Sequence, residues 1–148
     1  MDTKKLYIKS QKTVLNWGLG LATAFFIITL CNLIINRYSV NRLSLMIQTA
    51  IYTCMFAFSL INRIKINKNA ALVAFSAYAL FSIYLIVDMI VKAKQTYTSI
   101  CLAFPNSPLT LTLISYTVGL TVIFGVNFLY YKVYKSTLRI QTLESKSH

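Results

Sequence analysis

Four long apolar segments separated by polar connections make up most of this chain. They cover residues 14–35, 43–61, 70–91 and 109–131 and contain 22, 19, 22 and 23 residues, respectively. A helix rises about 1.5 Å per residue, so each segment would reach roughly 28 to 35 Å and could cross the hydrocarbon core of a bilayer. The pattern therefore predicts four transmembrane helices.

The overall composition agrees with this interpretation. Hydrophobic residues make up 57% of the 148 residues and charged residues only 12%, and the mean hydropathy is +0.62. A soluble domain has about half apolar residues and about a quarter charged ones. The composition thus excludes an ordinary soluble domain and predicts an all-α, multi-pass integral membrane protein.

The connections between the apolar segments limit how the helices can be arranged. Residues 36–42 and 62–69 are so short that successive helices should be antiparallel neighbours. The third connection is predicted to be a loop over residues 95–108, because Pro105 and Pro108 favour turns. The expected fold is a four-helix antiparallel membrane bundle.

Lysine and arginine residues are distributed unevenly between the two sides of this bundle. Eleven of the 15 lie in the basic tails 1–13 and 132–148 and in the connection 62–69. Cytoplasmic segments carry the excess of positive charge, so both termini are predicted to be cytoplasmic. The net charge of +12 flanks the membrane, and we therefore expect contact with anionic lipid headgroups and not with nucleic acid.

The residue types that carry catalysis or bind metals are few and scattered. Cys31, Cys54 and Cys101 form no C-x-x-C pair, and the sole histidine is His148. The sequence contains no glycine-rich phosphate loop and no clustered metal ligands. We expect a protein that is not an enzyme and that needs no metal and no cofactor.

Asp88 is the only acidic residue within the four apolar segments. In the predicted orientation it lies about one turn from the outer end of its helix. The polar residues near that depth in the other three helices are Asn32, Gln48 and Thr112. Polar groups at one level of four helices predict an outward-facing ligand pocket, with Arg37 or Arg42 as counter-charge. The alternative is structural, because Lys92 follows Asp88 by four residues, the favourable order for a helical ion pair.

Small residues recur at intervals of four within the predicted helices. The pairs are Gly18 with Ala22, Gly20 with Ala24, and Ala70 with Ala74. This spacing lets a second helix approach closely, although glycine and alanine are also common in membrane helices without that role.

The ends of the second and fourth apolar segments are alike. They read Phe58-Ser59-Leu60-Ile61-Asn62-Arg63 and Val126-Asn127-Phe128-Leu129-Tyr130-Tyr131-Lys132. A Phe and an Asn near a basic residue resemble the ends of the even-numbered helices in the GtrA-like family, small four-helix membrane proteins of bacteria.

The resemblance implies a function in addition to a fold. Proteins of that family move polyprenyl-phosphate-linked sugars across the inner membrane or assist the enzymes that make them. By this resemblance, Asn62, Arg63, Asn127 and Lys132 would bind the lipid phosphate, with the two cations holding it. Alternatively, Arg63 and Lys132 are only the positive charges that set the topology.

Two other classes of function stay open. One is a membrane-embedded binding protein, such as a bacteriocin immunity or entry-exclusion protein or a small subunit of a larger complex, with a membrane-protein partner or a second copy of itself. The other is a phage-type holin or pore former. The abundance of Ile, Lys and Asn suggests an AT-rich coding source and favours the inner membrane of a bacterium, and the same composition also fits an organellar or viral membrane protein.

Overall fold

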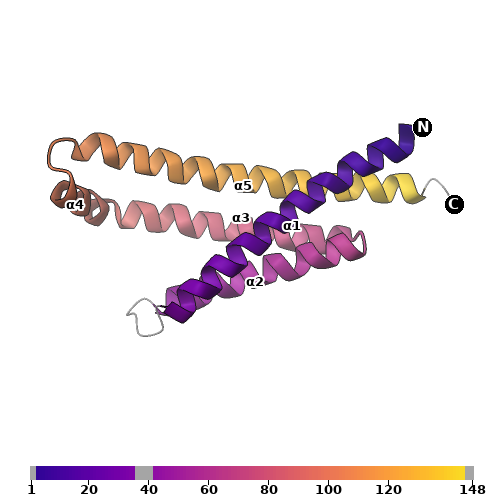
Figure 1. Cartoon of the computed structure of the whole chain (residues 1–148), viewed down its shortest axis with the longest axis horizontal. Helices are drawn as coiled ribbons and strands as arrows, with labels where there is room; N and C mark the ends of the chain where they lie inside the picture. The colour runs from indigo at the N-terminus through magenta and orange to yellow at the C-terminus, as the bar shows by residue number, and fades with distance from the viewer. Residues whose placement is uncertain (1–2, 36–41, 146–148) are drawn as a thin grey trace. The chain divides into compact units, whose positions relative to one another are not determined.

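The computed structural model describes residues 3–35 and 42–145, which form five α-helices. In chain order these are α1 (Thr3–Ile35), α2 (Arg42–Ile64), α3 (Lys68–Val91), α4 (Ala93–Ala103) and α5 (Pro108–Ser145) (Figure 1). There is no strand within the described residues. The all-α fold predicted from the sequence is confirmed.

Four of the helices, α1, α2, α3 and α5, are long and apolar enough to cross a membrane. Backbone amide and carbonyl groups find no water in a bilayer core, and a helix lets them bond within their own segment. Only a minority of the side chains in the most apolar part of each helix is buried inside the protein. The remaining side chains face outward, and the chain is an integral, multi-pass membrane protein.

Helices α1 and α5 extend well past the predicted spans. The first begins at Thr3, eleven residues before the expected start, and the second continues to Ser145, fourteen residues beyond the expected end. With 38 residues, α5 is about 57 Å long. The extension of α5 is not an isolated helix, because its Val133 and Ile140 form a buried cluster with Leu15 of α1.

The connection between α3 and α5 contains a helix where a loop was predicted. Helix α4 covers Ala93–Ala103 and begins one residue after α3 ends, so the prediction of a loop over residues 95–108 was wrong for most of its length. The two prolines interrupt helix only beyond this point. Pro105 lies in the turn after α4, and Pro108 is the first residue of α5, where its missing N–H removes no helical hydrogen bond.

The chain divides into two compact units. The first comprises the described residues up to Tyr78 and from Leu129 onward, and the second comprises Ala79–Phe128. The boundary falls inside α3 and inside α5, so each of these helices contributes to both units.

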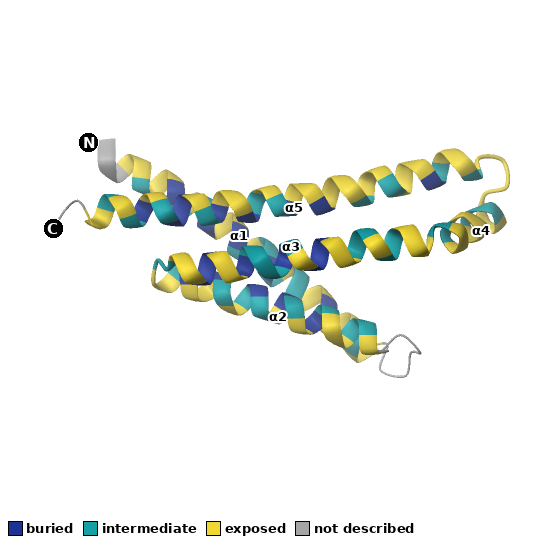
Figure 2. Ribbon diagram, turned by 180° about the vertical axis from the view of Figure 1, so that it is seen from behind, coloured by how far each residue is buried: buried dark blue, intermediate teal, exposed yellow. Residues whose placement is uncertain are grey.

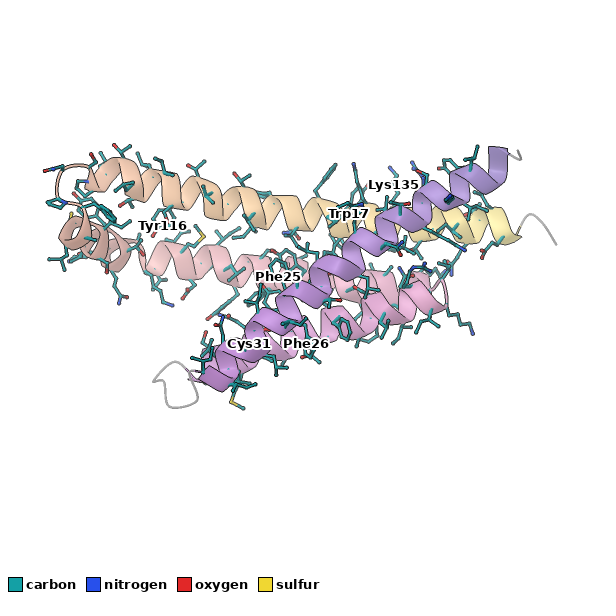
Figure 3. The ribbon with its side chains drawn as sticks, in the orientation of Figure 1. Trp17, Phe25, Phe26, Cys31, Tyr116 and Lys135 are labelled. Atoms are coloured by element: carbon teal, nitrogen blue, oxygen red, sulfur yellow. The ribbon has the colours of Figure 1, made fainter. Side chains whose placement is uncertain are left out.

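In the first unit, α1 packs along α2. Aromatic rings meet at this contact. The ring centroids of Phe25 and Tyr52 are 5.0 Å apart, and those of Phe26 and Phe56 are 5.2 Å apart and stacked (Figure 3). Ring pairs at such distances stabilise a contact by about 0.5 to 1.5 kcal/mol beyond the area they bury.

Small residues allow closer contacts elsewhere in the first unit. A Cβ atom at Gly18 would lie 2.6 Å from Val133 Cγ2 of α5, and Ala22 is fully buried. The Tyr130 hydroxyl donates a hydrogen bond of 3.2 Å to the Gly18 carbonyl. The buried small residues near the start of α3 are Ala70, Ala71 and Ala74. The Gly18 and Ala22 face is therefore used inside the protein, whereas Gly20 and Ala24 are exposed.

Both ends of the described chain lie at the same end of the first unit as the α2–α3 connection (Figure 1). Ile66, in that connection, packs against the cluster of Leu15, Val133 and Ile140. The Gln141 side-chain amide also donates a hydrogen bond of 3.0 Å to the Ile66 carbonyl. This is the arrangement expected of antiparallel spans, and the assignment of this end to the cytoplasm stays a prediction.

The second unit contains the rest of α3, all of α4 and most of α5. Within it, the Asn127 side-chain amide donates a hydrogen bond of 2.7 Å to Ser82 Oγ. The Tyr116 hydroxyl donates one of 3.0 Å to the Met89 carbonyl (Figure 3). Each bond joins α5 to α3. Most other side chains of α5 in this unit are exposed (Figure 2).

Candidate functional site

Asn62, one of the residues expected to bind a ligand, lies at the end of α2 and is only 1% exposed. Its amide nitrogen donates a hydrogen bond of 2.9 Å to Thr137 Oγ1 of α5, and its amide oxygen accepts one of 3.0 Å from the Asn67 backbone N–H. Through these two hydrogen bonds, the Asn62 side chain links the α2–α3 connection to α5. A ligand at Asn62 would have to replace these buried bonds, so its binding role stays a prediction.

Arg63, the next residue, is half-buried and lies at the same end of the first unit. Its Nε donates a hydrogen bond to Asn16 Oδ1 of α1. Because the asparagine acceptor is neutral, this contact orients the guanidinium without cancelling its charge.

The other two residues implied by the family resemblance belong to different units. Lys132 is exposed on α5 in the first unit. Asn127 is half-buried in the second unit, where its amide nitrogen reaches Ser82 Oγ and, at 3.0 Å, the Ile123 carbonyl of its own helix. The first unit therefore contains Asn62, Arg63 and Lys132 but not Asn127.

A groove of about 470 Å³ lies beyond the predicted spans in the first unit. It is lined by Tyr7 of α1 and by Lys135, Leu138, Arg139, Thr142 and Leu143 of α5. We call it the α1–α5 groove. Lys135 and Arg139 are exposed and one helical turn apart, and two leucines lie between and beside them. The groove thus combines two cations with an apolar lining.

Packing on the opposite side of α5 fixes the helix that carries these cations. Thr137 and Ile140 are fully buried, and the Gln141 amide is bound to the Ile66 carbonyl. Exposed and buried positions alternate with the helical period, so residues 135 and 139 face outward while residues 137, 140 and 141 face the protein. The groove therefore rests on an ordered helix and not on a free tail.

An aromatic ring accompanies Lys135 on α5. The Nζ atom of Lys135 lies 5.8 Å from the ring centroid of Tyr131, one turn earlier in the helix. This cation–π contact holds the ammonium group near the ring face. Glu144, the acidic residue of this helix, does not line the groove. The α1–α5 groove consequently has a positive lining.

The four polar residues predicted to share an outer level are divided between the two units. Asn32 is exposed and Gln48 is half-buried in the first unit, whereas Asp88 and Thr112 belong to the second. The Thr112 hydroxyl donates a hydrogen bond of 2.7 Å to the Pro108 carbonyl of its own helix. A ligand pocket formed by all four stays a prediction. Arg37 lies outside the described residues, as does the side chain of Arg42.

Asp88 forms the ion pair that its spacing predicts. Its carboxylate lies 2.8 Å from Lys92 Nζ, with the lysine side chain 52% exposed and the aspartate side chain 33% exposed. The hydrogen bond from Lys92 to Asp88 raises the pKa of the lysine. The structural interpretation of Asp88 is thus confirmed, and a further binding role is untested.

Two further buried polar features lie where helices of the first unit meet. Thr29 and Thr49 are buried where α1 meets α2, with the Thr49 hydroxyl 3.5 Å from the Thr29 carbonyl. Ser59 is also buried, and its Oγ atom has no hydrogen-bond partner among the described residues. These contacts belong to helix packing, and nothing about them points to a ligand.

The α1–α5 groove was also missed, although its signal is present in the sequence. Residues 135, 138, 139 and 142 follow the spacing of one helical face, with basic and apolar side chains side by side. The sequence alone predicts a basic tail here, because lysine and arginine after a transmembrane segment are ordinary topology signals.

Three comparisons with known proteins complete the description of the site. A scan against protein-family models, a search among curated proteins and a search among solved structures each found no match for this chain. The function is therefore argued from the geometry of the site.

Proposed function

We propose that this chain is a non-catalytic integral membrane protein that binds a phosphate-bearing lipid in the α1–α5 groove. Binding there would serve the translocation or handling of an anionic lipid carrier, such as a lipid-linked sugar. The observation that supports this function is that Lys135 and Arg139 line the same groove as apolar side chains, just beyond the predicted spans of α1 and α5.

The chemistry of the groove matches the two parts of such a lipid. A guanidinium group can bind a phosphate through two parallel hydrogen bonds, and an ammonium group adds a point charge. Leu138 and Leu143 line the same groove and offer apolar contact to the first part of a lipid chain. Tyr7 adds an aromatic ring with a hydroxyl, as is common at the level of lipid headgroups.

The depth of the groove also suits a headgroup. Lys135 lies four residues beyond the predicted end of the fourth span, which is about 6 Å along the helix axis. The headgroup region adds only a few ångströms to each side of the hydrocarbon core. Lys135 would thus lie at the level of the phosphates, and Arg139 could reach them from one turn farther out.

Native mass spectrometry of the detergent-solubilised protein tests this function. The probes are undecaprenyl phosphate and dioleoylphosphatidic acid, with dioleoylphosphatidylcholine as the zwitterionic comparison. Each basic residue near a membrane surface contributes about 1 kcal/mol to the binding of anionic lipid. The double variant Lys135→Gln with Arg139→Gln should therefore bind both phosphate probes roughly 30-fold more weakly.

Two further double variants serve as controls. Lys65→Gln with Lys68→Gln removes the same charge from the exposed α2–α3 connection and should leave binding almost unchanged. Arg63→Gln with Lys132→Gln tests the residues implied by the family resemblance. Equal losses in all three variants would show that only net charge matters, and that result would overturn the groove as the site.

A second candidate function is a binding protein for another membrane protein. Trp17, Gly20 and Ala24 share one face of α1, and all three are exposed. A Cβ atom at Gly20 would have no neighbour within 4 Å. Such a face can receive a partner helix. If it does, affinity purification in mild detergent should recover a stoichiometric partner, and Gly20→Leu should lose it while keeping lipid binding.

A further inference from the structure

Helix α4 is placed by its chain connections at the surface of the membrane. Only Lys92 separates it from α3, and residues 104–107 connect it to α5. Both neighbouring helices are long and apolar enough to cross the bilayer. A segment of 11 residues held at both ends in this way cannot move far from the lipid surface.

The orientation of α4 within the second unit differs from that of a span. Its axis is turned across α3 and α5 and does not continue either of them (Figures 1 and 2). If α3 and α5 cross the bilayer, α4 then runs along its plane. With 11 residues, or about 16 Å, it is far too short to span.

The side chains of α4 are sorted by their position on the helix. Ala93, Tyr97, Ile100 and Cys101 share one face, and Ala93, Ile100 and Cys101 are half-buried against the rest of the second unit. The opposite face contains the exposed polar residues Gln95, Thr98 and Ser99, with one apolar exception, Leu102, which is 83% exposed. The more covered face of α4 is therefore the more apolar one, and the fully exposed face is mainly polar.

Polar side chains on both faces of α4 have hydrogen-bond partners within the helix. The Thr98 and Ser99 hydroxyls donate hydrogen bonds of 2.9 and 3.0 Å to the carbonyls of Lys94 and Gln95. On the apolar face, a hydrogen bond with Cys101 raises the pKa of Tyr97. No acidic residue lies in α4, and Lys94 adds positive charge at its start.

From this placement we infer that α4 is an interfacial helix that binds the lipid headgroup layer on the face opposite the chain termini. Its Tyr97, Ile100 and Cys101 face rests on the acyl chains, and its Gln95, Thr98 and Ser99 face contacts water. The partner is the membrane surface itself. Helices of this kind insert their apolar face by about 5 to 10 Å. In this position α4 anchors the second unit at a fixed depth.

Spin labelling of the full chain in vesicles tests this inference. The vesicles contain phosphatidylcholine and phosphatidylglycerol, and the background carries Cys31→Ser and Cys54→Ala. The native Cys101 is labelled directly. Variants with Cys101→Ser receive one cysteine in turn, at Gln95, Tyr97, Thr98, Ser99 or Ile100. Oxygen reports exposure to lipid, and a water-soluble nickel chelate reports exposure to water.

We expect the ratio of oxygen to nickel accessibility to oscillate with the helical period of 3.6 residues. The maxima should fall at positions 97, 100 and 101, and the minima at positions 95, 98 and 99. High nickel accessibility at all positions would place α4 in water and overturn the inference. Maxima on the 95, 98 and 99 face would overturn it as well. The label on native Cys101 introduces no new cysteine, so its oxygen preference gives an answer even if another variant fails to fold.

Discussion

The two units of this protein differ in how their helices are held together. In the first unit, fully buried polar side chains such as Asn62 and Tyr130 connect three different helices. In the second unit, Asn127 and Tyr116 connect only α3 and α5, and most neighbouring side chains are exposed (Figure 2). The first unit is therefore held together by buried hydrogen bonds among three helices, whereas the second is mainly a pair of helices whose outer side chains are exposed.

The difference explains why the basic groove belongs to the first unit. Lipid chains are as apolar as leucine, so membrane helices associate through close packing and hydrogen bonds and not through the hydrophobic effect. A site for a phosphate needs cations on a rigid element. The extension of α5 meets this need, because Thr137, Ile140 and Gln141 fix it on the side opposite Lys135 and Arg139.

The largest loss of stability is expected from Asn62→Ala in the first unit. The substitution removes the hydrogen bond to Thr137, leaves the Asn67 N–H without its acceptor and creates a cavity. We expect the free energy of unfolding in detergent to fall by about 2 to 3 kcal/mol.

Asn127→Ala is the matched change in the second unit. Asn127 is half-buried and its amide contacts Ser82, so its loss should cost only about 0.6 kcal/mol, the average for hydrogen bonds between membrane helices. Denaturant titration of both variants gives the comparison. Equal losses would contradict the difference between the two units.

A medium effect is expected from Gly18→Ala. The added Cβ would lie 2.6 Å from Val133 Cγ2, and valine has little rotational freedom to move away. Gly20→Ala is the control, because a Cβ there meets nothing within 4 Å. Both changes improve helix propensity equally, so thermal unfolding should separate them by about 2 kcal/mol, with Gly18→Ala the less stable. Indistinguishable variants would show that α1 and α5 are not in close contact there.

The smallest effect is expected from Asp88→Asn, because the ion pair with Lys92 is exposed and weakened by salt. The pair raises the pKa of Lys92 above its ordinary value of 10.5. Its stabilisation is therefore fully present below pH 10.5 and disappears as the pH rises through the higher value in the folded protein. Melting curves of wild type and variant should differ slightly at neutral pH and coincide at strongly alkaline pH. A gap that persists there would assign Asp88 another role.

The four spans could be predicted from the sequence because hydropathy and length determine them almost alone. The spacing of Gly18 and Ala22 predicted a face that can pack, and this face is buried, but the same spacing at Gly20 and Ala24 leaves both exposed among the described residues. Spacing identifies a face that can pack, and only the other helices determine whether it does.

Helix α4 and the α1–α5 groove could not be predicted for a different reason. The prolines at 105 and 108 favoured a loop, yet they lie beyond the last residue of α4 and do not interrupt it. Lys135 and Arg139 follow a transmembrane segment, as basic residues that set the topology do. Their position in a groove depends on Tyr7, which lies more than a hundred residues earlier in the chain. Contacts between such distant residues leave no local pattern.

Photo-cross-linking in native membranes tests the lipid groove most directly. p-Benzoylphenylalanine replaces Leu138 in the α1–α5 groove or, as the comparison, Leu113 in a hollow of about 280 Å³ in the second unit that has no charged lining residue. Lipids attached after irradiation are identified by mass spectrometry. The account predicts that phosphate-bearing anionic lipids are enriched at position 138 relative to position 113. The same lipid mixture at both positions would contradict it.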